Sequence, residues 1–416
     1  MTEQAKVPEI RFAGFTDPWE QRKFGDCFEF LKSNTLSRAG LNGENGTARN
    51  VHYGDILIKF GDCLDGERSD LPFITDDTVL PKFAGSILRE GDVIFADTAE
   101  DEAAGKCVEL RKLPKEPTIS GLHTIPARPR FFFGTGYLGH YLNSDAYHRQ
   151  LLPLMQGIKV ISVSKAALQD TQVRFPGLSE QAAIGAALSE IDNLITLHQR
   201  KYDKLVVFKK SMLEKMFPKD GESVPEIRFA GFTDPWEQRK ASEVFQIVDD
   251  RGHPTLPVLS ATQNQGMIYR DDSGRYIGHD ESNEIGYKRV LPGDFVVHLR
   301  SFQGGFAHSQ YEGITSPAYT VFRAKEPTSH SDRFWKHWFM SEHFIAGLST
   351  VTYGIRDGRS ISVDEFMNTF LAFPAVEEQA AISRLFDYLD DLITLHQRKL
   401  ELLQNIKKSL LDKMFA

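Results

Sequence analysis

The sequence predicts an α+β protein built as a pseudo-twofold internal repeat, in which two mixed α/β domains are separated by a long antiparallel coiled coil of two helices. Three observations predict this fold. One short segment occurs twice without a change, one long helical segment occurs twice with its apolar pattern kept, and the stretches between these segments are unlike each other. A duplicated frame around divergent contents is expected when one architecture carries two specificities.

The short repeated segment, here called the box, runs from Pro8 to Lys23 and returns from Pro225 to Lys240 with all 16 residues identical. The box opens each half of the chain, and a long helix closes each half. This order predicts a first domain over 1–176, a central helix over 177–221, a second domain over 222–374 and a C-terminal helix over 375–416. Drift of a tandem duplication under no functional demand is the alternative, but drift would have eroded the boxes as much as the domains.

The long repeated segment predicts a coiled-coil helix, because its apolar residues recur at alternating steps of three and four. The second copy follows the first after 198 positions, and both copies place a His and a Lys on the seam where an apolar residue is expected. We interpret the two histidines as residues that set the register and not as ligands. The predicted seam residues are Ile184, Leu188, Ile191, Ile195, His198 and Leu205 in the first copy, and Ile382, Phe386, Leu389, Ile393, His396 and Leu403 in the second.

The order of charges predicts how the two helices pair. Acidic residues occupy the leading half of each copy and basic residues the trailing half, which suits the helix macrodipole. An antiparallel pair sets the acidic half of one helix against the basic half of the other, whereas a parallel pair sets like charges together. At 1.5 Å per residue, about 40 residues make a rod of roughly 60 Å. Two separate helices, each packed on its own domain, remain the alternative.

The composition is that of an ordinary soluble protein, with 41% apolar and 25% charged residues among 416. The sequence has no long apolar run and no signal-peptide pattern, so we expect a cytoplasmic location. Cys27, Cys63 and Cys107 are too few and too widely spaced for a disulfide framework or a CxxC metal site. The net charge of −8 argues against a free-standing nucleic-acid binder, unless basic residues are local or a partner supplies the rest.

Inside the domains, Gly-Asp turns followed by apolar residues predict strands. Three such segments run from Tyr53 to Ile58, from Glu90 to Phe95 and from Pro292 to Val297. Helices are predicted near 144–155 and 332–348, the latter rich in aromatic residues. Each domain is therefore predicted to mix helices with strands.

The sequence contains none of the common catalytic motifs. It lacks the GxxxxGK[ST] phosphate loop, the GxGxxG fingerprint, HExxH and GxSxG. The acidic run from Asp97 to Glu102 matches no metal-binding loop, and we interpret it as an exposed turn. We therefore expect a chain with no catalytic residue, no bound metal and no cofactor of its own.

Loops rich in Arg, Gln, Asn, Ser and His follow the predicted strands, and these residue types suit the reading of DNA. Arg pairs with guanine O6 and N7, Gln and Asn pair with adenine N6 and N7, and Gly lets the backbone approach a phosphate. Polar loops that contain glycine are nevertheless common on any protein. The candidates in the first domain are Ser37, Arg38, His52, Tyr53, Lys59, His123 and Arg128. Those in the second domain are Thr262, Gln263, Arg270, His298, Arg300, Ser301, Gln303, Arg356 and Arg359.

Taken together, these features resemble the specificity subunit of type I restriction-modification systems over essentially the full chain. The resemblance rests on the alternation of variable and repeated segments, on the Pro-Glu-Ile-Arg-Phe-x-Gly-Phe-x-x-x-Trp box, and on the Glu-Gln-x-x-Ile opening of each long helix at 180–184 and 378–382. It implies that each variable segment is a target-recognition domain for one half of a bipartite DNA site, with the helices as a spacer. It also adds Thr124 and Tyr319 to the candidate DNA-facing residues.

The resemblance further implies double-stranded DNA, two copies of an adenine-N6 methyltransferase subunit and restriction subunits with motor and nuclease activity as partners. S-adenosylmethionine, ATP and Mg would then be cofactors of these partners, which agrees with the lack of catalytic motifs in this chain. The unlike domains imply an asymmetric DNA target. Two alternatives stay open: a coiled-coil scaffold that binds proteins but not DNA, and a self-sufficient nuclease or methyltransferase.

Overall fold

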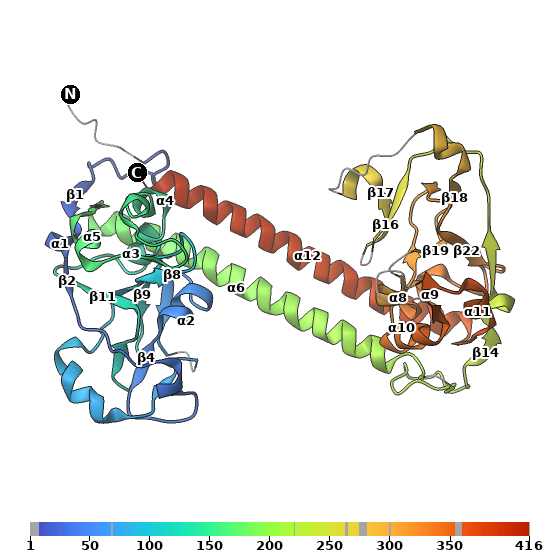
Figure 1. The fold of residues 1–416 in the computed structure, drawn as a ribbon, viewed down its shortest axis with the longest axis horizontal. Coiled ribbons are helices and arrows are strands. Elements are labelled where there is room, and N and C mark those ends of the chain that lie inside the picture. Colours follow the sequence, from blue (N-terminus) through green and yellow to red (C-terminus); the bar gives the residue numbers. More distant parts are fainter. Residues whose placement is uncertain are drawn as a thin grey trace. The chain divides into compact units, whose positions relative to one another are not determined.

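The computed structural model describes residues 8–67, 70–219, 221–262, 265–273, 281–298, 301–353 and 360–415. The chain divides into two compact units, unit 1 with residues 1–199 and 398–416, and unit 2 with residues 200–397. Each unit holds one α/β domain together with a part of both long helices (Figure 1). Among the described residues, no helix combines the length and the hydropathy needed to cross a membrane.

Unit 1 begins with the first box and continues as a domain of short strands and helices. Its strands are β1 Glu20–Lys23, β2 Phe28–Phe30, β3 Leu41–Asn42, β4 Arg49–Val51, β5 Cys63–Asp65, β6 Phe73–Ile74, β7 Val93–Ala96, β8 Thr98–Ala99, β9 Cys107–Arg111, β10 Thr118–Ser120, β11 Thr124–Pro129, β12 Ile161–Ser162 and β13 Gln172–Phe175. Its helices are α1 Phe24–Cys27, η1 Arg38–Gly40, α2 Tyr53–Ile58, η2 Asp77–Ser86, α3 Tyr137–Leu142, α4 Asp145–His148, η3 Leu152–Leu154, α5 Lys165–Asp170 and the first part of α6 Leu178–Lys215.

Unit 2 repeats this plan with the second box. Its strands are β14 Glu237–Lys240, β15 Phe245–Val248, β16 Leu259–Thr262, β17 Gly266–Tyr269, β18 Lys288–Val290, β19 Phe295–Val297, β20 Ala307–His308, β21 Gly313–Thr315, β22 Thr320–Ala324, β23 Thr352–Tyr353, β24 Ser360–Ile361 and β25 Phe370–Phe373. Its helices are α7 Ala241–Val244, η4 Arg270–Ser273, η5 Glu281–Gly286, α8 Ser301–Gly304, α9 Asp332–Trp338, α10 Glu342–Gly347, η6 Leu348–Val351, α11 Val363–Asn368 and the first part of α12 Val376–Met414.

Each domain contains its own central sheet, and the two sheets are similar in strand order although the sequences of the domains differ. Unit 1 has a five-stranded sheet in the order β2-β11-β7-β9-β5, and unit 2 has a four-stranded sheet in the order β15-β22-β19-β20. In both units the strand after the box pairs antiparallel with a later strand, which in turn pairs antiparallel with the strand that follows a Gly-Asp turn. In both units the box strand itself pairs antiparallel with the last strand before the long helix.

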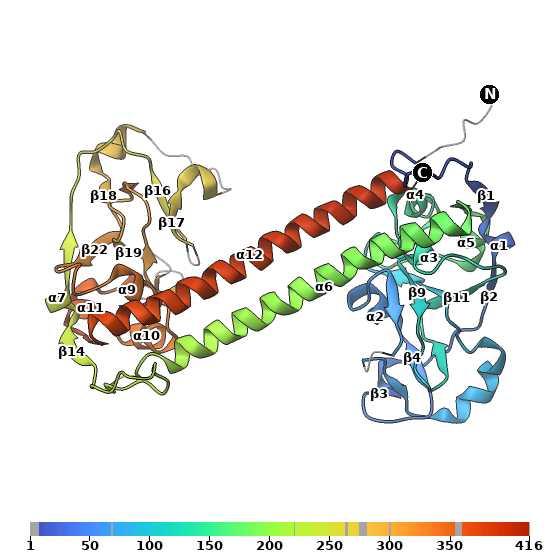
Figure 2. The same ribbon diagram turned by 180° about the vertical axis from the view of Figure 1, so that it is seen from behind.

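The long helices α6 and α12 contain 38 and 39 residues. In unit 1 the start of α6 runs beside the end of α12, and in unit 2 the end of α6 runs beside the start of α12 (Figures 1 and 2). The helices are therefore antiparallel within each unit, as the charge order predicts. The predicted fold class, two mixed α/β domains with a long antiparallel helix pair, is confirmed.

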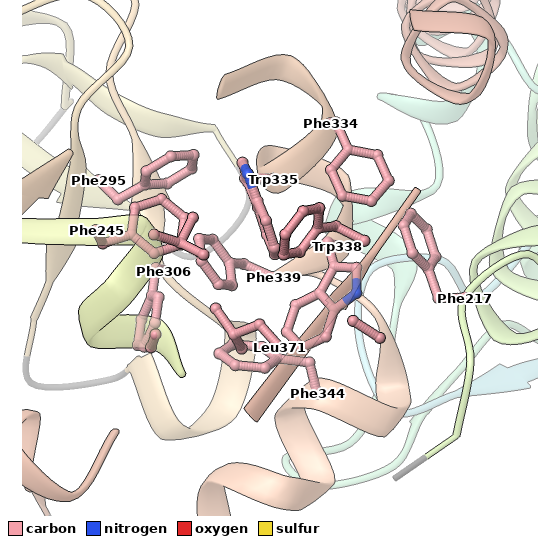
Figure 3. Close-up of a cluster of buried hydrophobic side chains, with 14 of the residues drawn as sticks. Phe217, Phe245, Phe295, Phe306, Phe334, Trp335, Trp338, Phe339, Phe344 and Leu371 are labelled. Atoms are coloured by element: carbon pink, nitrogen blue, oxygen red, sulfur yellow. The ribbon is translucent and has the colours of Figure 1, made fainter. Parts of the chain in front are cut away.

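The core of unit 2 is aromatic, and most of its rings come from the segment around α9. Trp335 is fully buried, stacks on Phe339 with ring centroids 5.6 Å apart and meets Phe245 edge-on at 5.2 Å. Figure 3 shows these rings gathered with Phe217, which follows α6. Phe217 also stacks on Phe386 of α12 at 5.8 Å. Large rings bury about 150–250 Å² each, so this cluster fastens both long helices to the domain of unit 2.

The segment from Tyr53 to Ile58 is the helix α2, and its prediction as a strand is wrong. The ring of His52 accepts a hydrogen bond from the backbone N–H of Gly54 at 3.1 Å and caps the first turn. Asp55 and Ile56 are buried, whereas Ile58 is 85% exposed. An apolar run of this length has no period that separates a strand from one helical turn, and the cap decides between them.

Two strand predictions and both helix predictions are confirmed, whereas the acidic run predicted as an exposed turn over 97–102 includes the strand β8 and the buried Ala99. The Gly-Asp segments before residues 95 and 297 lead into the strands β7 and β19. The helix predicted near 144–155 appears as α4 and η3, and the helix predicted near 332–348 appears as α9 and α10. All three cysteines are free.

Candidate nucleic-acid interface and its frame

The box is held to the start of a long helix by an ion pair that occurs once in each unit. The guanidinium of Arg11 lies 2.6 Å from the carboxylate of Glu180 and forms a second hydrogen bond to it at 2.8 Å. Arg228 makes the same two bonds to Glu378, at 2.6 and 2.9 Å. Both carboxylates are buried, so each pair ties a box to the first turn of the helix that closes the same half of the chain.

The box also binds the end of the other long helix. The backbone N–H of Ile10 donates to the carbonyl of Lys413 at 3.0 Å, and that of Ile227 donates to the carbonyl of Lys215 at 2.9 Å. The last carbonyls of a helix have no partner within the helix, so these bonds satisfy them. The Trp of each box packs edge-on against the Phe that follows the same helix, with ring centroids 6.5 Å apart for Trp19 and 6.2 Å for Trp236.

The glutamines of the Glu-Gln openings bind the domain loops. The side-chain oxygen of Gln181 accepts a hydrogen bond from Gly134 N at 2.8 Å, and that of Gln379 accepts one from Ser331 N at 3.1 Å. The repeated sequence therefore encodes a joint of three parts: box, start of one helix and end of the other. This joint explains why the box and the helix openings are duplicated together.

The two seam lysines form ion pairs across the helix pair. Lys407 of α12 lies 2.5 Å from Asp192 of α6 and 2.7 Å from Asp62, all within unit 1. Lys209 of α6 lies 2.5 Å from Asp390 of α12, within unit 2. Lys407 follows Lys209, and Asp390 follows Asp192, after the same 198 positions as the helix repeat, so one register holds in both units.

A histidine from each domain joins these ion pairs. His140 of α3 lies 2.9 Å from Asp192, and His337 of α9 lies 3.1 Å from Asp387, and both imidazoles are fully buried. Groups of this kind can hold a metal ion, here Asp62, His140 and Asp192 in unit 1 and His337, Asp387 and Asp390 in unit 2. The ammonium groups of Lys407 and Lys209 already supply the positive charge at these places. We interpret both groups as salt networks that join domain to helix pair.

The predicted seam residues are all buried or half-buried. Their side of each helix is most enclosed near the domains, where Leu188 and Phe386 are inaccessible to solvent. His198 and His396 are half-buried, and neither is without a partner. Their role in setting the register stays a prediction.

Five of the candidate DNA-facing residues of unit 1 form one surface cluster. Arg38 and Lys59 converge on the buried carboxylate of Asp55, at 2.8 and 3.1 Å, while about half of each cationic side chain stays exposed. Burial raises the pKa of Asp55, but the bonds from Arg38 and Lys59 outweigh this effect and hold that pKa below its ordinary value. Asp55 thus stays ionised and holds Arg38 and Lys59 at the surface. The cluster consists of Arg38, His52, Tyr53, Lys59 and His123.

Aromatic rings form the other half of this cluster. Tyr53 lies between His52, at a ring distance of 4.7 Å, and His123, at 5.3 Å. Burial, followed by Arg38, lowers the pKa of His52, which leaves its ring neutral and able to accept the capping bond. His123 is half exposed, 3.3 Å from Asp97, with a φ of 52° in the left-handed region. Unfavourable backbone of this kind is more frequent at functional sites than elsewhere.

The structure gives two other candidates of the set, Arg128 and Thr124, internal partners. Arg128 makes two hydrogen bonds to the buried Asp92, at 2.7 and 2.9 Å, and Arg323 pairs with Asp294 in the same place of unit 2 at 2.7 Å. The hydroxyl of Thr124 bonds to Gly121 O, and Ser37 is exposed just before η1. DNA contacts by Arg128, Thr124 and Ser37 stay predictions.

In unit 2 the candidates lie in two places. His298 and Tyr319 have rings 6.1 Å apart, next to the buried Ser301, whose hydroxyl accepts from His298 N at 2.9 Å. Gln303 of α8 is exposed beside them in sequence. Arg270 is half-buried near Tyr287, and its Nε and Nη1 make no hydrogen bond within the described part of the chain.

The remaining candidates are structural or lie outside the described residues. Thr262 closes the turn between β16 and β17 by donating to Gly266 O at 2.8 Å. Gln263, Arg300, Arg356 and Arg359 lie outside the described residues. The sequence did not indicate the roles of Asp55, Asp92 and Asp294, although all three belong to the Gly-Asp segments, because a turn signal does not reveal which arginine a carboxylate will meet.

The duplicated frame defines the chain as an internally repeated protein of two unlike α/β domains and two long antiparallel helices. Its sequence is 20% identical over 425 residues, covering 99% of this chain and 94% of the relative, to the putative type I restriction enzyme MjaX specificity subunit of Methanocaldococcus jannaschii. It is 25% identical over 276 residues, covering 62% of this chain and 64% of the relative, to the type I restriction enzyme MjaVIII specificity subunit of the same organism. No family model matches the chain.

A solved structure has the same fold. The S subunit of a type I restriction-modification system from M. genitalium superposes with a TM-score of 0.57 at 11% identity, and 99% of each chain is covered. The resemblance to specificity subunits of type I restriction-modification systems is therefore confirmed by the names of its relatives and by its fold.

Proposed function

We propose that this chain is the non-catalytic DNA-recognition subunit of a type I restriction-modification complex. The observation that carries the proposal is the similarity to a named specificity subunit along 99% of the chain. The resemblance supplies the class of activity, and the chain's own surface residues supply the contacts. The candidate interfaces of unit 1 and unit 2 would each read one half of a bipartite DNA site.

The unit 1 cluster has the chemistry that a DNA surface needs. Arg38 and Lys59 present cationic groups, and only one buried carboxylate, Asp55, holds both. Such cations bind phosphates, which position a protein on DNA, while His123 and Tyr53 offer groups for base edges. Asp55 neutralises one of these two cations and Asp97 lies beside His123, so the proposed partner subunits would supply most of the positive charge that the net charge of −8 calls for.

The unit 2 candidates differ from those of unit 1 in residue type. The described candidates there are Gln303, His298 and Tyr319, whereas Arg38 and Lys59 lead in unit 1, and Arg270 adds a half-buried guanidinium near Tyr287. Different contact residues on the same type of sheet read different bases, so the DNA site is proposed to be asymmetric.

The helix pair is proposed to hold the partner subunits. Apolar side chains stay exposed along both helices within each unit, at Leu197, Leu402 and Ile406 in unit 1 and at Val207, Phe208, Tyr388 and Leu395 in unit 2. Exposed apolar patches of this kind mark protein interfaces. Two methyltransferase subunits and restriction subunits, which use S-adenosylmethionine, ATP and Mg, are the proposed partners. A scaffold that binds proteins but not DNA is the alternative.

The test is the sequence preference of the complex reconstituted from this chain and its methyltransferase subunit. N6-methyladenine mapped over a random DNA library should reveal one bipartite, asymmetric motif. His123→Ala should relax one half of the motif and Gln303→Ala the other, each by about 1–3 kcal/mol if the lost contact is bidentate. Arg149→Ala, at the exposed residue that follows α4, is the control and should change neither half.

Two outcomes would count against the proposal. Methylation without sequence preference would favour the protein-only scaffold. Methylation by the isolated chain with S-adenosylmethionine would show that the chain is itself an enzyme. An equal loss of binding on all sequences would instead assign the substituted residue to a phosphate contact.

A further inference from the structure

The two boxes are identical, but the loop that crosses each box differs. The loop before α3 carries Phe131, Phe132 and Phe133, and the loop before α9 carries the small and polar triplet at 328–330. The two loops occupy the same place, because the residue after each triplet donates its backbone N–H to the Gln of the nearby helix opening. Position 131 therefore corresponds to position 328, and position 133 to position 330.

In unit 1 the chain covers its own box arginine with an aromatic ring. The guanidinium of Arg22 lies over Phe131, 5.2 Å from the ring centroid, and 5.9 Å from that of Phe175 at the end of β13. Phe133 packs edge-on against Phe175 at 5.2 Å. A guanidinium over a ring is attracted by the electrons of the ring face. The flat face of the Arg22 guanidinium therefore has an aromatic partner within unit 1.

In unit 2, His330 stands at the position of Phe133, and Thr328 stands at the position of Phe131. His330 packs edge-on against Phe373 at 4.7 Å, as Phe133 packs on Phe175. Position 328 holds Thr, which has no ring to offer Arg239. Arg239 instead lines a pocket of about 450 Å³ together with the box, the loop and the start of α12. Its wall includes Arg228, Arg239, Ser329, His330, Phe373 and Gln379.

The charges around this pocket disfavour an anion. Arg228 is bound to Glu378 and Arg239 to Glu237, both at 2.6 Å, and Asp234 and Glu326 add two further carboxylates to the lining. The carboxylates therefore outnumber the guanidinium groups, and a cation is repelled only where it would lie directly on Arg239, at the position that Phe131 fills in unit 1.

Most polar groups of the wall have partners, and the exception is Nδ1 of His330, which is buried and makes no hydrogen bond within the described part of the chain. The Gln379 amide donates to Pro374 O and Ser329 O and accepts from Ser331 N. Burial, followed by Arg239, lowers the pKa of His330, which keeps its imidazole neutral. The guanidinium of Arg239 is the flat group of this wall that is about half exposed, whereas His330 and Phe373 are almost fully buried. Flat faces of this kind pack best against an uncharged aromatic ring.

We propose that this pocket receives an aromatic side chain of a partner subunit, which stacks on Arg239 as Phe131 stacks on Arg22 in unit 1. The inference rests on the proposed assembly with partner subunits. The rim carries the exposed apolar side chain of Val376. In unit 1, Phe131 already covers the face of Arg22, so the aromatic side chain of the partner binds only at Arg239 in unit 2.

The experiment compares the same substitution in the two identical boxes. The full chain carries Arg239→Ala, Arg239→Lys or Thr328→Phe, and the matched control carries Arg22→Ala. Thr328→Phe places in unit 2 the ring that unit 1 already holds, and Arg239→Lys keeps the charge but removes the flat face. Binding of the purified methyltransferase and restriction subunits is measured separately for each variant by titration calorimetry.

All three unit 2 variants should weaken the binding of one subunit by about tenfold, and Arg22→Ala should change it less than twofold. Benzoylphenylalanine at position 329 should then crosslink to an aromatic-containing segment of that subunit, and the same probe at position 132 should not. Near-UV circular dichroism checks that Thr328→Phe is folded, and Arg239→Lys serves as the second variant.

Unchanged affinity in all three unit 2 variants, or an equal loss with Arg22→Ala, would overturn the inference. The DNA sequence preference of the same complexes is measured in parallel. If the complex methylates one bipartite motif but the pocket substitutions do not change the affinity for the subunits, only this inference is contradicted. If the complex shows no sequence preference, the proposed function is contradicted.

Discussion

At the scale of single residues, the box arginines have the largest predicted effect on stability. Arg11→Ala would leave the carboxylate of Glu180 buried without its two hydrogen bonds. Removing one partner of a buried ion pair destabilises by about 3–5 kcal/mol, because the remaining charge stays desolvated. Arg228→Ala should have the same effect on unit 2 through Glu378. Urea unfolding of the two variants, followed by circular dichroism, measures both losses.

A double substitution separates the ion pair from the fold around it. Arg11→Met with Glu180→Gln removes both charges and keeps the volume, so it should restore most of the stability lost in Arg11→Ala. If the double variant is as unstable as the single one, the pair is not the cause of the loss.

The acid sensitivity of unit 2 should depend on His330. Burial, followed by Arg239, lowers the pKa of His330 below its ordinary 6.5, so the unfolded chain binds this proton more readily than the folded chain. The stability contributed by the neutral ring is therefore present above pH 6.5 and is lost as the pH falls below it. His330→Phe places the residue of the matching unit 1 position there and should flatten the dependence of stability on pH from about 6.5 to 5.

Three of the four tryptophans, Trp236, Trp335 and Trp338, lie in unit 2, so tryptophan fluorescence during urea unfolding reports mainly on that unit. The measurements are made at about pH 7.5 and about pH 5.5, which lie above and below the ordinary pKa of a histidine side chain. An identical loss of stability on acidification in His330→Phe and in the unchanged protein would exclude His330 as the source.

At the residue scale, the sequence allowed the positions of the frame to be predicted but not their partners. The Lys at each seam was visible as an exception to the heptad, yet Asp62, the second partner of Lys407, comes from a distant part of the chain. Likewise, Arg128 has the residue type of a DNA contact, and only the fold reveals that Asp92 holds it. Long-range pairing of side chains has no period in the sequence.

At the scale of elements, the seam lysines should set the register of the helix pair. Lys407→Met would leave Asp192 and Asp62 facing each other without their shared cation. Burial lowers the pKa of Lys407, but Asp62 and Asp192 outweigh it and raise that pKa, so the lysine is charged throughout the neutral range. We expect a loss of about 2–3 kcal/mol, discounted for partial exposure. Lys209→Met should weaken unit 2 through Asp390.

The control for this prediction removes both charges of the pair. Lys209→Met combined with Asp390→Asn leaves no unpaired charge between the helices, and it should recover part of the stability lost in Lys209→Met, because Lys336 keeps Asp387 as its partner. Thermal unfolding of the single and double variants gives the coupling energy between the two positions. A coupling near zero would mean that the pair does not contribute to the register.

Elements with a long period were predictable, and short ones were not. The apolar pattern of the two long helices repeats over several heptads and therefore predicts them, and the Gly-Asp turns correctly predicted β7 and β19. The same signal failed at α2, where one histidine cap turns a short apolar run into a helix. Local propensity is weak over six residues, so a single capping bond decided the element.

At the scale of the whole molecule, the internal repeat made the architecture predictable. Identical boxes required identical surroundings, and the structure supplies them as the same joint of box, helix start and helix end in both units. The contents of the two domains were not predictable in this way, because their sheets are built from residues far apart in the chain. The unlike triplets at 131–133 and 328–330 show that even the frame carries differences that its repeated part does not reveal.

The spacer role that the resemblance implies for the two long helices gives the prediction that belongs to the whole chain. A heptad inserted into α6 between positions 193 and 208, together with one in α12 between positions 391 and 406, preserves both lysine pairs and the phase of the seam. Seven residues lengthen each helix by about 10 Å, which corresponds to about three base pairs of B-DNA. Methylome sequencing should show two unchanged half-sites separated by about three additional base pairs. A heptad inserted into α6 alone would misalign the two lysine pairs and should abolish assembly, whereas an altered half-site in the double insertion would contradict the spacer role.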